Sequence, residues 1–317
     1  MITLHWLYAL AGAMFAAFAL LSVRDATNPK RVGNAAFWGL IAASFWFGDL
    51  IGDRGNGLLV LALVALAGTG SIGRGTAQST SIGQREASAV TLGNQLFVPA
   101  LIIPLTAFLG TMLFTHTPLK DYGLVEAKYV TLILLGVGVL LALGYCLAWL
   151  KPPLTAPVEE GRRLMDSIGW AAVLPQMLAA LGAVFAAAGI GTAIGAIVGA
   201  IIPANSAFLA VLVYALGMAG FTMIMGNAFA AFPVMAAAVG IPILVVGHHG
   251  NPAVIGAVGM LAGFCGTLMT PMAANFNIVP AALLELKDQY GVIRAQIATA
   301  LPLLAFNILI LWLFGFR

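Results

Sequence analysis

Charged residues are scarce in this chain. Asp, Glu, Lys and Arg make up only 8% of the 317 residues, whereas 62% of the residues are hydrophobic. A soluble globular protein carries about 25% charged residues, and a water-soluble fold of this length needs a charged surface that so few residues cannot supply. This deficit excludes an ordinary soluble domain, because lipid is the natural solvent for so much apolar side-chain area.

Sequence motifs for catalysis and metal binding are also missing. Cys146 and Cys265 each stand alone in an apolar segment, so they form neither a disulfide framework nor a metal-ligand spacing. The chain has no HExxH motif, and its basic residues are scattered between apolar runs instead of forming a patch for nucleic acid. We therefore expect no enzyme activity, no catalytic or metal-ligating residue, no cofactor and no nucleic-acid partner.

Long apolar runs make up most of what is present. A helix that crosses the hydrocarbon core needs about 20 mostly apolar residues. The clear runs cover residues 2–23, 33–52, 57–71, 94–115, 127–150, 168–188, 206–225, 253–272 and 295–316, and shorter or interrupted runs cover 190–204 and 228–246. The sequence therefore predicts an all-α polytopic membrane protein with about 9–11 transmembrane helices, some of them broken or re-entrant.

The distribution of Lys and Arg predicts the orientation of the first five spans. The even-numbered loops contain three basic residues, whereas the odd-numbered loops, at 24–32, 72–93 and 151–167, contain eight: Arg24, Lys30, Arg31, Arg74, Arg85, Lys151, Arg162 and Arg163. The odd-numbered loops are therefore expected in the cytoplasm and the N-terminus outside. The first apolar run is too long for the core of a cleaved signal peptide, so we expect it to be retained.

The segment 151–167 divides the chain. Its sequence, KPPLTAPVEEGRRLMDS, combines prolines and charges without apolar periodicity, which is typical of a linker. It separates a five-span half, residues 1–150, from a half with interrupted helices, residues 168–317. Because five is odd, a similar second half would lie inverted in the membrane, as in many secondary transporters. No residue-level repeat is visible, so inverted repeats rest on the count of spans alone.

Three polar breaks interrupt the apolar runs of the second half, at 225–229, 248–252 and 270–280. A backbone break at membrane depth is tolerated only where it is buried in protein or lines a watery cavity, and the helix N-termini that it exposes suit a carboxylate. Each break is alternatively an ordinary surface loop in which proline ends a helix. On the first interpretation the candidate solute-binding residues are Thr222, Asn227, Thr270, Asn275 and Asn277.

Ionisable residues suggest where a coupling ion would bind. Asp49 is the one acidic residue clearly inside a predicted span, and an intramembrane carboxylate is a functional candidate by default; a solvated position paired with Arg54 is the favoured alternative. His248 and His249 can titrate near neutral pH, although adjacent histidines in a Gly–Asn–Pro turn are typical of a loop. These three residues are the candidates for coupling to Na⁺ or H⁺.

The stretch 69–81, TGSIGRGTAQSTS, is rich in glycine and hydroxyl groups. It lacks the GxxxxGK[ST] order of a phosphate loop and follows an apolar span in place of a sheet strand, so we do not expect it to bind nucleotide. A cytoplasmic loop or a re-entrant tip is the expected structure. Without a nucleotide site, an ion gradient is the expected energy source.

Two segments carry a family resemblance: MGNAFAAFPVMAAAVGIP at 225–242 and VVGHHGNPAVIGAVGMLAGFCGTLMTPMAANFNIVPAALLEL at 245–286. With the opening LHWLYALAGAMFAAFALLSVRDATNP, they resemble the membrane family catalogued as domain of unknown function 979, over essentially the whole chain. The resemblance implies a bacterial inner-membrane subunit that works with a second, smaller membrane protein, and an association with 5-oxoproline (pyroglutamate) uptake. It also implies a relation to the ion-transporter superfamily of carboxylate carriers, but it transfers no binding residues.

The function expected from these features is a subunit of a secondary transporter for a small carboxylate, with 5-oxoproline as the first choice and an ion gradient as the energy source. Its partners would be the lipid bilayer, the solute, and a second smaller membrane subunit or further copies of the chain. Two alternatives stay open. One is an assembly subunit that transports nothing, and the other is an intramembrane enzyme that uses His248 or His249 with a nearby hydroxyl.

Overall fold

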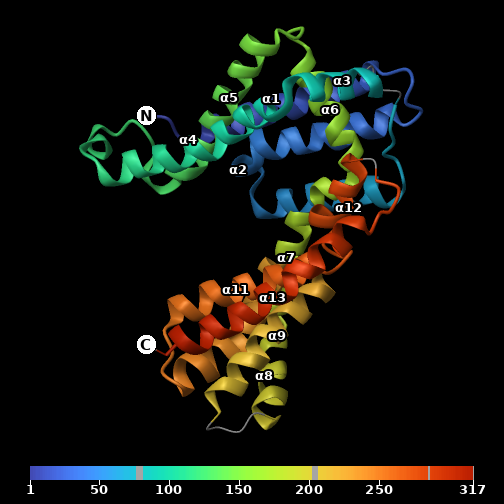
Figure 1. Ribbon diagram of the computed structural model, residues 1–317. Helices are drawn as coiled ribbons and strands as arrows, with labels where there is room; N and C mark the ends of the chain where they lie inside the picture. The colour runs from blue at the N-terminus through green and yellow to red at the C-terminus, as the bar shows by residue number, and fades with distance from the viewer. Residues whose placement is uncertain (76–80, 202–205, 285, 317) are drawn as a thin grey trace. The chain divides into compact units, whose positions relative to one another are not determined.

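The computed structural model describes residues 1–75, 81–201, 206–284 and 286–316 (Figure 1). Within these ranges the regular elements are all helices, and seven of the helices are long and apolar enough to cross a membrane. Three shorter apolar helices accompany them. The predicted class, an all-α polytopic membrane protein, is confirmed. The chain forms two compact units, Met1–Asp166 and Ser167–Arg317.

The first unit begins with two helices that pack along each other, α1 (Leu4–Arg24) and α2 (Arg31–Gly68). The contact is close because Gly12 leaves room for the indole of Trp46, whose Nε1–H donates to the carbonyl of Ala9 at 3.1 Å. The sequence predicted two spans, 33–52 and 57–71, in place of the single element α2. A break does occur inside α2, at Gly52, where φ is 62°, a value that glycine adopts without steric cost.

The first unit also contains a helical hairpin. It is formed by α4 (Phe97–His116) and α5 (Val130–Leu150), which the short helices η2 (Pro118–Tyr122) and η3 (Ala127–Tyr129) connect. Gly110 faces the side chain of Leu134 and Gly138 faces the backbone of Ile103, so small residues let these helices approach closely.

Two segments that the sequence predicted as loops contain helices. Part of 72–93 forms α3 (Ile82–Leu92), which begins with a capping box between Ser81 and Gln84 and continues through η1 (Gly93–Leu96) into α4. Most of 151–167 forms α6 (Ala156–Ile168), an amphipathic helix that buries Asp166. The prolines at its start hid this periodicity in the sequence, although a helix tolerates proline in its first turn.

The second unit contains the interrupted helices. Its elements are η4 (Gly169–Val173), α7 (Leu174–Ala187), α8 (Ile190–Ile201), α9 (Ala207–Met225), α10 (Ala228–Met235), the π-helix η5 (Ala236–Gly247), α11 (Pro252–Leu268), α12 (Ala274–Leu283) and α13 (Gly291–Phe314). The last residues of the predicted run 190–204 lie outside the described residues. Figure 1 shows α9, α11 and α13 side by side, and these three helices contact one another.

Helix α9 forms the centre of this unit. Its fully buried Tyr214 packs against Gly240 of η5 and Gly259 of α11, and its Met218 packs against Gly263 of α11. The order of these contacts shows that α9 and α11 run in the same direction, while α10 and η5 run back between them. The end of α9 and the end of α11 therefore lie at the same end of this three-helix group.

Candidate solute and ion site

The first and the third polar breaks meet in the structure. The hydroxyl of Thr270 donates to the carbonyl of Met223 at 2.9 Å, in the last turn of α9. Gly226 follows with φ at 75°, and a Cβ there would collide with the carbonyl of Met272. Asn227 then begins α10 by accepting the N–H of Phe229 at 2.7 Å. We call this place, residues 222–227 and 267–277, the break junction.

The second break lies elsewhere. His248 and His249 precede α11, whose 17 residues separate them from the break junction by roughly 25 Å at about 1.5 Å per residue. The ring of His248 meets Phe316 edge to face, with centroids 6.2 Å apart, and His249 is exposed with φ at 54°. The structure therefore brings together Thr222, Asn227, Thr270, Asn275 and Asn277, and it leaves the two histidines at the far end of α11.

Two buried oxygen atoms at the break junction have no hydrogen-bond partner among the described residues. Asn277 is fully buried, and its Nδ2 donates to the carbonyls of Thr267 at 2.8 Å and Thr270 at 2.7 Å. Both donors of the amide are therefore used, and Oδ1 accepts no hydrogen bond from any described residue. The hydroxyl of the fully buried Thr222 is likewise unpaired among those residues. Leaving such a group unsatisfied costs about 1–3 kcal/mol, so packing alone does not account for the pair.

Helix N-termini add positive potential to these acceptors. Both α10 and α12 begin at the break junction, and the Ala273 side chain at the start of α12 offers no cap to its free N–H groups. Asn275 lies half-buried in that first turn. Free N–H groups and the positive end of a helix dipole favour an anion, while Oδ1 of Asn277 and the hydroxyl of Thr222 accept from an N–H donor or coordinate a cation.

The break junction lies alongside α13 and not at its end. Asn307 of α13 contacts Cys265 of α11 through Nδ2 and Sγ at 3.5 Å. Sixteen residues of α13 precede Asn307, whereas α11 ends three residues after Cys265, so α13 continues for roughly 20 Å beyond the end of α11. Because α13 is long enough to cross a membrane, the break junction falls within the length of a spanning helix.

Asp49 does not lie in a buried polar site. It is exposed, three residues before the break of α2 at Gly52, and it makes no ion pair with Arg54 in the described part of the chain. The favoured pairing with Arg54 is therefore not formed among the described residues. Among the described residues no group of three or more His, Cys, Asp or Glu is placed to hold a metal ion.

A buried carboxylate that the sequence analysis missed lies in the first unit. Asp166 of α6 is 8% exposed, and its Oδ1 accepts from Trp38 Nε1 at 2.8 Å and from Asn34 Nδ2 at 3.0 Å. The guanidinium of Arg162 lies 3.8 Å from Oδ2 and pairs with Asp25 at 2.8 Å. We call Asp25, Asn34, Trp38, Arg162 and Asp166 the carboxylate cluster. The spacing of Arg162 and Asp166, four residues apart, was the available sequence signal.

The surroundings shift the pKa values of the two carboxyl groups in the carboxylate cluster in opposite directions. Burial raises the pKa of Asp166, against the opposing effects of the Trp38 hydrogen bond and the Arg162 charge. Burial also acts on Asp25, but hydrogen bonds from Thr27 and Arg162 outweigh it and lower the pKa of Asp25. Asp166 is therefore the carboxyl group of the pair that takes up a proton more readily.

The glycine-rich stretch after α2 is anchored to Asn34 of the carboxylate cluster. The side chain of Asn34 accepts the N–H of Gly73 at 2.8 Å and donates to its carbonyl at 2.7 Å. Asn28 donates to that carbonyl at 3.2 Å, and Gly33 leaves space for the carbonyl of Ser71. Residues 76–80 of the stretch lie outside the described residues. The part that is described is anchored through Gly73 to Asn34 and Asn28.

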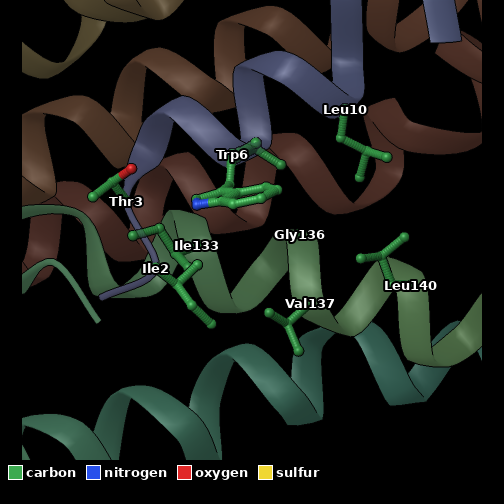
Figure 2. Close-up of a pocket in the computed structure, with 9 residues that line it drawn as sticks. Ile2, Thr3, Trp6, Leu10, Ile133, Gly136, Val137 and Leu140 are labelled. Atoms are coloured by element: carbon green, nitrogen blue, oxygen red, sulfur yellow. The ribbon is translucent and has the colours of Figure 1, made fainter. Parts of the chain in front are cut away.

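A pocket between α1 and α5 has a different character. Figure 2 shows it lined by apolar side chains from both helices, among them Leu10, Val137 and Leu140. Its volume is about 330 Å³, and the hydroxyl of Thr3 and the indole of Trp6 are the polar side-chain groups in the lining. Because none of these lining residues is charged, the pocket is unsuited to a carboxylate.

Helices of this length and composition, with polar groups buried between them, define a multi-pass helical membrane protein. The model of the family described as "Protein of unknown function (DUF979)" matches residues 5–316, so the chain belongs to this family. No curated protein and no solved structure matches the chain. The resemblance expected from the sequence is therefore confirmed at the level of the family.

Proposed function

We propose that the protein is a subunit of a secondary transporter for a small carboxylate, and that the solute binds at the break junction. The observation that carries the proposal is the pair of unpaired buried oxygens, on Thr222 and Asn277, beside two helix N-termini. Unsatisfied acceptors within the length of a spanning helix favour binding of a solute that supplies a hydrogen-bond donor.

The chemistry of 5-oxoproline matches this arrangement. Its carboxylate suits the N-termini of α10 and α12. Its lactam N–H is a donor that Oδ1 of Asn277 or the hydroxyl of Thr222 can accept, and its lactam carbonyl can accept from the amide of Asn275. Asn277 itself cannot donate to the solute, because both of its N–H groups are used within the protein.

The remaining parts of the proposal follow from the same function. The chain would reside in the bacterial inner membrane with its N-terminus outside, and it would work with a smaller membrane subunit or with further copies of itself. An ion gradient of Na⁺ or H⁺ would supply the energy. The proposal includes no catalytic step and no resident cofactor.

Uptake of labelled 5-oxoproline into proteoliposomes, with and without a co-purified smaller subunit, tests the proposal. We expect accumulation under an imposed Na⁺ or H⁺ gradient, and competition by other small carboxylates. Absence of uptake of any small carboxylate under either gradient would contradict it. The assembly-subunit alternative is favoured if Asn227→Ala and Asn277→Ala leave solute affinity unchanged while the complex fails to assemble.

A further inference from the structure

The carboxylate cluster has a geometry that fits a proton-binding site. Oδ1 of Asp166 is held by two neutral donors from α2, Asn34 and Trp38, so this oxygen is fully engaged. Among the described residues, the contact of Oδ2 is the Arg162 guanidinium at 3.8 Å, which is too far away for a hydrogen bond. One oxygen of the carboxylate therefore has room for a proton while the other keeps its contacts.

The charges around Asp166 favour its neutralisation. The charged groups that face it are Arg162, on its own helix, and Asp25, at the end of α1. Arg162 lies closer to Asp25 than to Asp166, so two carboxylates share one cation in a buried place. Among the described residues, the groups of α2 that contact Asp166 are the neutral donors Asn34 and Trp38.

Asp166 also holds a helix in place. Its hydrogen bonds to Asn34 and Trp38 connect α6 to α2, and α6 carries the chain from the first unit into the second. Burial makes Asp166 take up a proton more readily where α6 is docked than where it is exposed to water, so proton uptake favours the docked helix and ionisation weakens its docking. The protonation state of this residue therefore sets how firmly α6 is docked.

We propose that Asp166 is a proton-binding site that controls transport: Oδ2 takes a proton from hydronium, Arg162 then pairs with Asp25 alone and α6 stays docked, and when the proton returns to water the buried carboxylate is charged and the loosened α6 permits the transport cycle. This inference rests on the proposed transport function. It differs from the sequence-based choice of Asp49, because Asp166 is buried and hydrogen-bonded whereas Asp49 is exposed.

The first measurement does not depend on transport. Infrared difference spectra of the full-length protein, recorded over a pH titration in detergent, should show a protonated carboxylic acid whose carbonyl band persists to higher pH than the bands of the exposed carboxyl groups. This component should be absent in Asp166→Asn and retained in Glu159→Gln, which alters an exposed carboxylate on the same helix. A component at the same high pH that survives in Asp166→Asn would overturn the inference.

The second measurement connects the proton to transport. Counterflow exchange of 5-oxoproline, with equal pH on both sides of the vesicle, should rise at least tenfold as pH rises through the transition of Asp166, and Glu159→Gln should behave like the wild type. Asp166→Asn should exchange at a rate that does not change with pH. In Trp38→Phe the transition should move to higher pH, because a hydrogen bond that favours the ionised form is lost. This second variant keeps the test decisive if Asp166→Asn fails to fold.

The outcomes separate the two proposals. Wild-type protein with no exchange at any pH contradicts the transport function, and the infrared titration still decides whether Asp166 binds a proton. Exchange that keeps its wild-type pH dependence in Asp166→Asn contradicts the control by Asp166 and leaves transport standing. Exchange that is flat with pH in Asp166→Asn, with a shifted transition in Trp38→Phe, supports both.

Discussion

The two compact units bury polar groups in different ways. The break junction in the second unit consists of neutral side chains and helix ends, and it leaves the oxygens of Thr222 and Asn277 without partners among the described residues. The carboxylate cluster in the first unit combines the ionisable groups of Asp25, Arg162 and Asp166 with neutral donors, and each of the two carboxyl groups contacts Arg162. Unpaired neutral acceptors suit reversible binding of a ligand, whereas interacting ionisable groups suit a structure that changes with protonation.

The largest expected effect sharpens the account of the break junction. Gly226→Val should destabilise the protein by about 3 kcal/mol or more, because the new side chain meets the carbonyl of Met272 and the backbone has a positive φ. Thermal unfolding in detergent measures this loss. Gly220→Ala on the same helix is the control: a Cβ there meets nothing within 4 Å, so stability should be kept or should rise slightly.

The next effect probes the carboxylate cluster. Arg162→Ala leaves two largely buried carboxylates without their cation, which should cost about 3 kcal/mol. Arg294→Ala removes an ion pair with Asp288 whose side chains are 74% and 42% exposed, and it should cost less than about 1 kcal/mol. Equal losses in the two variants, measured by thermal unfolding, would show that the carboxylate cluster contributes no more than a surface pair.

A variant at the break junction should lose function while gaining stability. Thr222→Val keeps the shape of the side chain and removes an unpaired buried hydroxyl, so the folded state should be more stable by about 1 kcal/mol. If that hydroxyl contacts solute, affinity should fall about tenfold, which corresponds to about 1.4 kcal/mol. Stability and affinity that fall together would indicate a structural role for Thr222 instead.

The smallest effect is a dependence of stability on pH. The pKa of Asp166 is raised in the folded protein above its ordinary value of 3.8, so the folded state binds a proton at pH values where the unfolded chain does not. Stability should therefore rise as pH falls towards 3.8 and decrease as pH rises through the folded-state pKa. Asp25 has a pKa below its ordinary value of 3.8, so its stabilising contribution is present above pH 3.8 and is lost only as pH falls below 3.8. Melting temperatures of the wild type relative to Asp166→Asn measure this slope.

The sequence predicted the membrane class and the main spans because an apolar run of about 20 residues is stable in lipid and poorly stable in water. It selected Thr222, Asn227, Thr270 and Asn277 as candidates for one site, and the structure brings them together at the break junction. It could not separate His248 from that group, since the direction of α11 depends on packing against α9.

Asp166 was missed for a related reason. Its segment, with prolines and charges, is typical of an exposed linker, and only the docking of α6 against Trp38 and Asn34 makes it a buried carboxylate. Asp49 shows the converse case. Its position in an apolar run made it a candidate for ion coupling, with a solvated position paired with Arg54 as the favoured alternative, and in the structure it is exposed.

The affinity of 5-oxoproline for two capping variants tests the central claim most directly. Asn227 and Asn251 both cap a helix through Oδ1, the first at the break junction and the second at the far end of α11. Each change to alanine should cost about 1 kcal/mol of stability. We predict that Asn227→Ala weakens solute binding at least tenfold, measured by calorimetry, while Asn251→Ala binds like the wild type. Equal affinity in both variants, at or near that of the wild type, would contradict a solute site at the break junction.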